Sequence, residues 1–158
     1  YWSKIKGTEK AKTIEPSEDY IIPFGKARIA LSHDSNETNT ICVITYGMGV
    51  HWAKSAVEKL NVNADILDLR TLLPLDDEAI FNSVKKTNKV LILHEDCLTG
   101  GIGGELAALI NEHCFEYLDA PVMRCASMDT PVPFAVELEN QFLPLEELDE
   151  KINQLVNY

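Results

Sequence analysis

The residues best suited to chemistry lie in one stretch, His94-Glu95-Asp96-Cys97. A cysteine ionises when an imidazole or a helix terminus is close, so Cys97 and His94 could act as a nucleophile and its base. Residues three apart on a non-helical segment rarely adopt that geometry. We therefore favour His94 as a polar contact at a strand end, in an interface, over an independent cysteine enzyme.

A glycine-rich loop, Thr99-Gly100-Gly101-Ile102-Gly103-Gly104-Glu105, follows directly. Glycines let the backbone approach an anion, and a helix N-terminus supplies positive potential for a phosphate. The spacing matches neither of the common phosphate-binding patterns, and Glu105 would repel an anion while favouring the helix start. A structural turn is the simpler interpretation, and a flavodoxin-like phosphate- or nucleotide-binding module remains the alternative function.

The elements that position this stretch alternate between strand and helix. Val90 to Leu93 is an apolar run typical of a buried parallel strand, and helical spacing of apolar residues follows the glycines. We predict strands over residues 26–31, 41–46, 64–69, 90–93 and 121–126, and helices from about residue 50, over 76–86 and 103–117, and from 144. Such alternation predicts a parallel sheet covered by helices on both faces.

Two further patterns refine this expectation. Ala27, Ile29 and Leu31 alternate with polar or small residues, which indicates a half-exposed edge strand. The segment 129–135, Asp-Thr-Pro-Val-Pro-Phe-Ala, contains prolines that exclude regular helix or sheet.

Length and charge limit the classes of function. A chain of 158 residues suits one domain with one sizeable core. The formal charge of −11, from 25 acidic and 14 basic residues, argues against nucleic acid or an anionic membrane as a partner. It favours a basic protein partner or simple solubility. No apolar run approaches the roughly 20 residues needed to cross a bilayer, and no leader pattern is present.

The four cysteines, Cys42, Cys97, Cys114 and Cys125, show no metal-ligand spacing, and we expect them to be reduced and intracellular. Residues 1–19 lack a core-forming period, so we expect a linker or arm from an upstream domain, followed by one domain over 20–158. The chain begins at Tyr1 without a methionine, so we expect it to be a piece of a longer polypeptide.

Several motifs in order, none decisive alone, identify a resemblance. They are Ile22-Pro23-Phe24-Gly25-Lys26-Ala27, Thr45-Tyr46-Gly47, residues 68–76 (Asp-Leu-Arg-Thr-Leu-Leu-Pro-Leu-Asp), residues 83–87 (Ser-Val-Lys-Lys-Thr), His94-Glu95, residues 98–101 (Leu-Thr-Gly-Gly), residues 118–121 (Leu-Asp-Ala-Pro) and residues 129–133. Together they resemble the C-terminal domain of the beta subunit of thiamine-diphosphate-dependent 2-oxo acid dehydrogenases. The Leu-Thr-Gly-Gly and Asp-Thr-Pro-Val-Pro versions look closer to branched-chain (2-oxoisovalerate) enzymes than to pyruvate enzymes.

The resemblance implies a transketolase C-terminal-type domain with three α/β/α layers and a mixed five-stranded sheet, mostly parallel with an antiparallel first strand. It also implies that thiamine diphosphate and Mg²⁺ are held by other domains. We therefore expect no catalytic, cofactor-binding or metal-binding residue in this piece, and no activity from it alone. The full-length oxidoreductase would decarboxylate a 2-oxo acid and acylate a lipoyl group.

Partners follow from the same resemblance. In relatives, a small basic domain of the dihydrolipoyl acyltransferase meets acidic groups that correspond here to Asp119 and the terminal Tyr158, with Glu116 as a plausible neighbour. We expect contacts with an alpha subunit or the remaining domains, as a dimer or heterotetramer, through His51, Arg70, His94 and Glu95. The expected location is cytoplasmic, or the mitochondrial matrix in a eukaryote. The 2-oxo acid, and whether the native chain is a separate beta subunit or an alpha-beta fusion, stay open.

Overall fold

The computed structural model describes residues 14–33 and 40–158. The expected arm over residues 1–19 lies mostly outside the described residues. Its described part, residues 14–19, is exposed.

The sheet has five strands in the order β1-β3-β2-β4-β5. They are β1 (Arg28–Leu31), β2 (Ile41–Thr45), β3 (Ala64–Asp68), β4 (Val90–Cys97) and β5 (Met123–Ser127). β1 pairs with β3 antiparallel, and the other neighbours are parallel. The predicted mixed sheet with an antiparallel first strand is confirmed.

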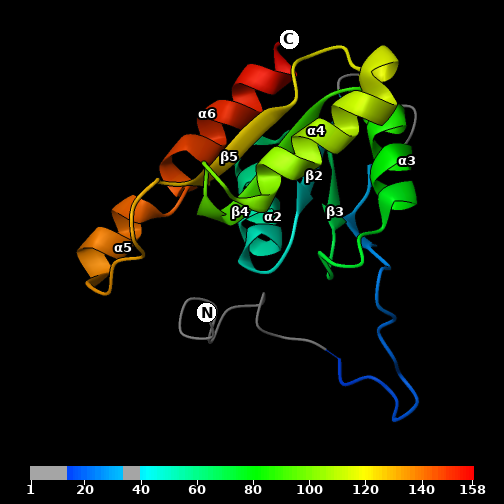
Figure 1. Cartoon of the computed structure of the whole chain (residues 1–158), viewed down its shortest axis with the longest axis horizontal. Helices are drawn as coiled ribbons and strands as arrows, with labels where there is room; N and C mark the ends of the chain where they lie inside the picture. Colours follow the sequence, from blue (N-terminus) through cyan, green and yellow to red (C-terminus); the bar gives the residue numbers. More distant parts are fainter. Residues whose placement is uncertain (1–13, 34–39) are drawn as a thin grey trace.

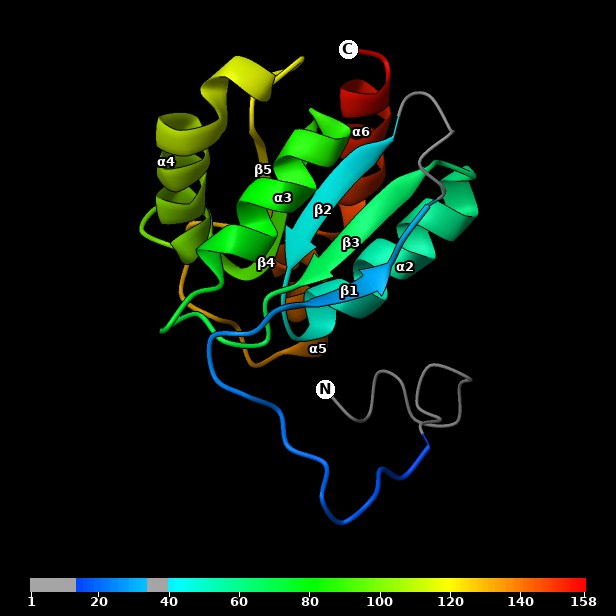
Figure 2. The ribbon, with the colours of Figure 1, turned by 90° about the vertical axis from the view of Figure 1, so that its right-hand side faces the viewer.

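Helices cover both faces of this sheet (Figures 1 and 2). The helical elements are α2 (Met48–Leu60), α3 (Asp77–Thr87), α4 (Ile102–Cys114), the 3-10 turn η2 (Phe115–Tyr117), α5 (Val136–Phe142) and α6 (Leu145–Val156). α2 and α6 pack on one face with Val43, Ile66 and Leu93, whereas α3 and α4 pack on the other with Ile44 and Ile92. Successive side chains on a strand point to opposite faces, so each buried strand serves both cores.

The carboxyl ends of the parallel strands lie at one edge of the sheet, which we call the carboxyl edge. The turn before α2, the segment after β3, the first turn of α4 and the segment before α5 all leave the sheet there. Because β1 is antiparallel, the chain enters β1 from the same edge (Figure 2). The opposite end of the sheet, where β5 begins, lies beside the end of α4 and the chain's last residue (Figure 1).

Three local predictions were wrong. A register irregularity between Ile29 and Leu31 breaks the expected alternation in β1, so Ile29 is exposed while Ala30 packs on the core. β4 continues through His94 to Cys97, further than its apolar residues indicated. The helical spacing of the apolar residues after Pro144 also predicts that Leu145 faces inward with Leu148, Ile152 and Leu155, but Leu145 is exposed.

The short helix α5 was not predicted. Its sequence, Val-Glu-Leu-Glu-Asn-Gln-Phe, buries only Phe142 and projects from the body of the domain (Figure 1). A helix with one buried residue has too short an apolar stripe to be recognised from periodicity.

Candidate functional site

A groove of about 860 Å³ opens where the chain runs from the end of α4 into β5. Its lining comes from α4, η2, the strand approach and the last residue: Ala107, Ala108, Asn111, Phe115, Glu116, Leu118, Asp119, Ala120, Pro121, Val122 and Tyr158. The three residues expected to dock a partner, Glu116, Asp119 and Tyr158, all line it. Glu116 and Tyr158 are 42 positions apart in the sequence, and the structure brings them together in one groove.

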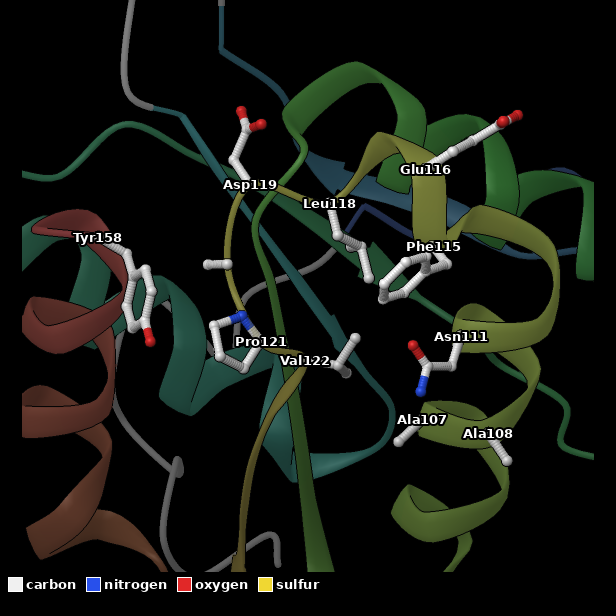
Figure 3. A pocket seen from close by; sticks show the side chains of 11 residues that line it. Ala107, Ala108, Asn111, Phe115, Glu116, Leu118, Asp119, Pro121, Val122 and Tyr158 are labelled. Carbon is white, nitrogen blue, oxygen red and sulfur yellow. The ribbon is translucent and has the colours of Figure 1, made fainter.

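The groove has aromatic walls and an apolar floor. Figure 3 shows Tyr158 facing the groove from one side and Phe115 from the other, with Pro121 and Val122 between them. Phe115 is 73% exposed and Tyr158 62% exposed. Large exposed aromatic surfaces are favoured at protein interfaces because they bury much apolar area with few rotatable bonds. Sequence reasoning from the acidic motif missed Phe115.

Both carboxylates lie at the rim. Asp119 stands above Pro121, and the Glu116 side chain extends away from the other lining residues (Figure 3). Both residues are exposed, and neither forms a salt bridge within the described part of the chain. The nearby Lys85 lies instead over the Tyr117 ring, 4.8 Å from its centroid. The rim is therefore acidic and available to a cationic side chain.

Asn88, after α3, fixes the backbone of this rim. Its φ of 63° places it in the left-handed region that asparagine tolerates, where it ends α3. Its carbonyl accepts a hydrogen bond of 2.9 Å from the Asp119 N–H, and its side-chain amide donates to the Tyr117 carbonyl. The acidic loop is thus held at both Tyr117 and Asp119.

Three of the expected subunit-contact residues lie at the carboxyl edge. His51 is in the first turn of α2, Arg70 follows β3, and Glu95 is in the last part of β4; each is partly buried. Arg70 has φ of 57°, a conformation that non-glycine residues rarely adopt and that costs of order 1–3 kcal/mol. Its N–H donates to Asp68 Oδ1 at 3.2 Å, which helps to hold that conformation.

His94, the fourth, requires a correction, because its side chain is 1% exposed. It points to the α4 face of the sheet, beneath Gly101 and Gly103. In this fold it offers no surface to another subunit. Periodicity could have indicated this: His94 follows Ile92 by two residues, and side chains two apart in a strand share a face.

A family model for the transketolase C-terminal domain matches residues 32–147. The chain belongs to this family. The resemblance expected from the motifs is confirmed, and the fold seen here is that of a transketolase C-terminal domain.

Curated relatives of this transketolase C-terminal domain are beta subunits. The chain is 45% identical over 132 residues to the 2-oxoisovalerate dehydrogenase subunit beta of Bacillus subtilis, covering 81% of this chain and 39% of that protein. It is 38% identical over 138 residues to the pyruvate dehydrogenase E1 component subunit beta of Rickettsia conorii, covering 85% of this chain and 39% of that protein. The chain thus spans about two fifths of the length of these relatives.

A solved structure supports the same fold. A split-gene transketolase described as an inactive beta4 tetramer superposes with a TM-score of 0.69 and 20% identity. The match covers 89% of this chain and 44% of that one. At this identity the likeness establishes the arrangement of the elements alone.

The glycine-rich loop of this transketolase C-terminal domain packs against its own strand. A Cβ at Gly101 would collide with the Cys97 carbonyl and the His94 ring, and one at Gly103 with His94 Nε2. These glycines therefore let α4 begin directly over β4. Glu105 lies in the first turn of α4, which has no side-chain cap. The negative charge of Glu105 disfavours an anion such as a diphosphate at this helix start, and the described residues contain no cluster of metal ligands.

The four cysteine thiols also have structural surroundings. All four cysteines are free. Burial raises the pKa of Cys42, and burial followed by the charge of Glu147 raises the pKa of Cys125 to about 12. The Cys97 Sγ lies 3.6 Å from the Thr130 carbonyl oxygen, whereas His94 is buried beneath α4.

Within the described residues, no helix is both long and apolar enough to cross a membrane.

Proposed function

We propose that this chain is the C-terminal domain of the beta subunit of a thiamine-diphosphate-dependent 2-oxo acid dehydrogenase, where it docks a dihydrolipoyl acyltransferase and contacts other subunits. The proposal rests on the family membership and on the beta-subunit relatives, of which the chain spans about two fifths. Thiamine diphosphate and Mg²⁺ would be held by the remainder of that enzyme. This domain would position its neighbours.

One observation carries the docking role: a single groove combines the Phe115 and Tyr158 rings with the Glu116 and Asp119 carboxylates. An apolar floor with an acidic rim suits a small basic domain whose Lys or Arg side chains reach the rim. The net charge of −11 would attract such a partner over distance.

Magnitudes distinguish the two parts of the groove. Exposed rim ion pairs contribute about 0.2–1 kcal/mol each and mainly accelerate association. A buried aromatic anchor can contribute about 2 kcal/mol or more. The aromatic walls would therefore set the lifetime of the complex, while Asp119 and Glu116 would set its association rate and salt dependence.

The test is titration calorimetry, with stopped-flow association at several salt concentrations, of this chain with the small basic domain of a dihydrolipoyl acyltransferase. Asp119→Lys should slow association and reduce the salt dependence. Phe115→Ala should weaken binding by on the order of tenfold or more, mainly through faster dissociation.

Glu58→Lys supplies the matched control, because Glu58 is an exposed acid on α2 and the substitution changes the net charge equally. It should leave dissociation unchanged. Binding that is unaffected by both Asp119→Lys and Phe115→Ala would overturn the docking role.

The carboxyl edge is our candidate for subunit contacts. Beside Arg70, His51 and Glu95, this edge carries apolar side chains that are each more than half exposed. Those on the segment around α5 are Met128, Val132, Phe134, Val136 and Leu138. Ile21 and Phe24 precede β1, and Leu73 follows β3. Extended exposed apolar surface marks an interaction site.

We propose that this edge contacts the alpha subunit or a second beta subunit in a dimer or heterotetramer. Sedimentation of the full-length enzyme would test it. Phe134→Ser should shift the assembly toward smaller species, whereas Phe115→Ala, in the groove, should not. An unchanged assembly in the Phe134 variant would refute the assignment.

For the full-length enzyme we propose a branched-chain 2-oxo acid as substrate, which would be oxidatively decarboxylated with acylation of a lipoyl group. The support is the higher identity to the 2-oxoisovalerate relative, 45% against 38% for the pyruvate relative. The ratio of kcat/KM for 2-oxoisovalerate and for pyruvate would test this. A ratio that favours pyruvate would refute it.

A further inference from the structure

We propose that His94 is a pH-sensitive lock on the first turn of α4, which holds that turn closed when the imidazole is neutral and releases it when the ring is protonated. The lock acts at the carboxyl edge, away from the docking groove. It requires neither the proposed partner nor the cofactor.

The geometry of His94 is unusual. The side chain is 1% exposed, and neither Nδ1 nor Nε2 has a hydrogen-bond partner among the described residues. Two glycines of the α4 start lie directly over the ring, close enough that a Cβ at Gly101 or Gly103 would overlap it. The imidazole therefore fills a space in which a new charge would have no access to water, and Asp96 would compensate for it only in part.

The α4 N-terminus above the ring makes a cation there less favourable still. Gly101 caps α4 without a side-chain hydrogen bond, and the His94 ring lies against the first turn of the helix, near its positive end. Arg124, on β5, donates from Nη1 to the Leu98 carbonyl at 3.2 Å and adds a second positive charge. On β4, Asp96 favours the cation, and Glu105 lies in the first turn of α4.

The balance of these groups favours neutral His94. Burial lowers the pKa of His94 below 6.5 and outweighs the opposing effect of Asp96, while Arg124 lowers it further. The open state of the turn would expose the ring to water and restore an ordinary pKa. Because the open state then binds more protons, the closed state loses stability as the pH falls below 6.5, until the pH reaches the value at which buried His94 titrates.

Release of the first turn of α4 would alter the neighbouring surface at the carboxyl edge. Residues 98–101 are tied to the segment before α5 through the hydrogen bonds of Thr99 with Asp129 and through the Leu98 N–H to the Ser127 carbonyl, at 3.1 Å. The apolar side chains of that segment begin at Met128. Loosening of the turn would therefore disturb the surface that carries them.

The experiment has two measurements on the 158-residue chain. Imidazole NMR signals followed from about pH 8 to about pH 5 give the titration midpoint of each histidine. Amide hydrogen exchange of residues 98–104, corrected for intrinsic rates, gives the population of the open turn. Opening should increase about tenfold for each pH unit that separates 6.5 from the His94 midpoint.

His94→Gln should abolish this pH dependence, because glutamine does not titrate. His113→Gln, an exposed histidine near the other end of α4, should keep it. A His94 midpoint at or above 6.5 in the unaltered chain would overturn the proposal even if the variant failed to fold. Equal pH dependence in the His94→Gln and unaltered chains would also overturn it.

Discussion

The carboxylate of Asp129 accepts two hydrogen bonds from Thr99, one from the backbone N–H at 2.8 Å and one from the hydroxyl at 2.6 Å. Thr99 belongs to the Leu-Thr-Gly-Gly motif and Asp129 to the Asp-Thr-Pro-Val-Pro motif. The two motifs that suggested the branched-chain resemblance are thus one structural unit. It joins the start of α4 to the segment before α5.

We predict that Asp129→Ala increases hydrogen exchange at the Thr99 amide about threefold. The effect is small because the site is exposed and water replaces the lost acceptor of the Thr99 N–H. Asp119→Ala, which removes another exposed acid, should leave Thr99 unchanged. An unaltered Thr99 exchange rate in Asp129→Ala would show that the two bonds do not persist in solution.

The same pair should respond to acid. The hydrogen bonds from Thr99 lower the pKa of Asp129 below 3.8. Its stabilising effect is therefore complete above about pH 4 and is lost as the pH falls through the lowered value. NMR titration of the Asp129 carboxyl carbon should give a midpoint below 3.8, and Thr99→Val should move it back toward 3.8. A midpoint that Thr99→Val does not move would contradict the assignment of cause.

Substitutions at two adjacent glycines in α4 should have opposite effects. A Cβ at Gly103 would overlap His94 Nε2, and the buried ring cannot move aside, so Gly103→Ala should destabilise the domain by about 1–3 kcal/mol. The nearest atom to a Cβ at Gly104 is Arg124 Nη1, at 3.7 Å, which is an ordinary contact. Gly104→Ala should stabilise α4 by about 0.5–1 kcal/mol, because alanine loses less backbone entropy.

Urea unfolding of both variants measures these free energies from the transition midpoints. The sign of the difference between the two variants is the test. If Gly103→Ala were as stable as Gly104→Ala, the close packing of His94 beneath α4 would be wrong.

Asp76 should act at two places at once. Its Oδ1 accepts from the Ala79 N–H at 3.3 Å and caps α3, while Oδ2 accepts from the Ala27 N–H at 2.9 Å and anchors the chain before β1. The residue is buried, so Asp76→Ala should cost about 1–2 kcal/mol of unfolding free energy. Asp76→Asn keeps one acceptor and should recover part of that loss.

The control is Asp77→Ala at the neighbouring exposed residue, which should cost about 0.3 kcal/mol at most. Equal unfolding free energies for Asp76→Ala and Asp77→Ala would contradict the double role.

Thiol reactivity should separate Cys97 from the other cysteines. Cys42, Cys114 and Cys125 are buried, and burial raises the pKa of each. Cys97 is only partly buried, so iodoacetamide should reach and modify Cys97 first. Mass spectrometry over time would follow the order. Rapid modification of Cys97 that His94→Gln abolishes would instead indicate a reactive pair.

The sequence determined much of the fold. Apolar runs such as Ile41–Thr45 and Val90 to Leu93 have no polar face, and a strand of this kind is stable only between two layers. Helix ends were similarly encoded, as at Asp76 and Asn88, because capping depends on side chains a few residues apart. α5 and the irregular pairing of β1 were not predicted. Both depend on contacts with distant parts of the chain.

The acidic motif around Asp119 predicted where a partner would dock. The order of the motifs along the chain indicated the family. Only the tertiary structure decided that Phe115, Asp119 and Tyr158 line one groove, since Tyr158 follows α6 and the other two follow α4. It also decided that the first turn of α4 covers His94, although strand periodicity alone places His94 on the same face as Ile92. Local patterns report which residues share a strand face or a helix turn, whereas burial and groove formation depend on which elements pack together across the sheet.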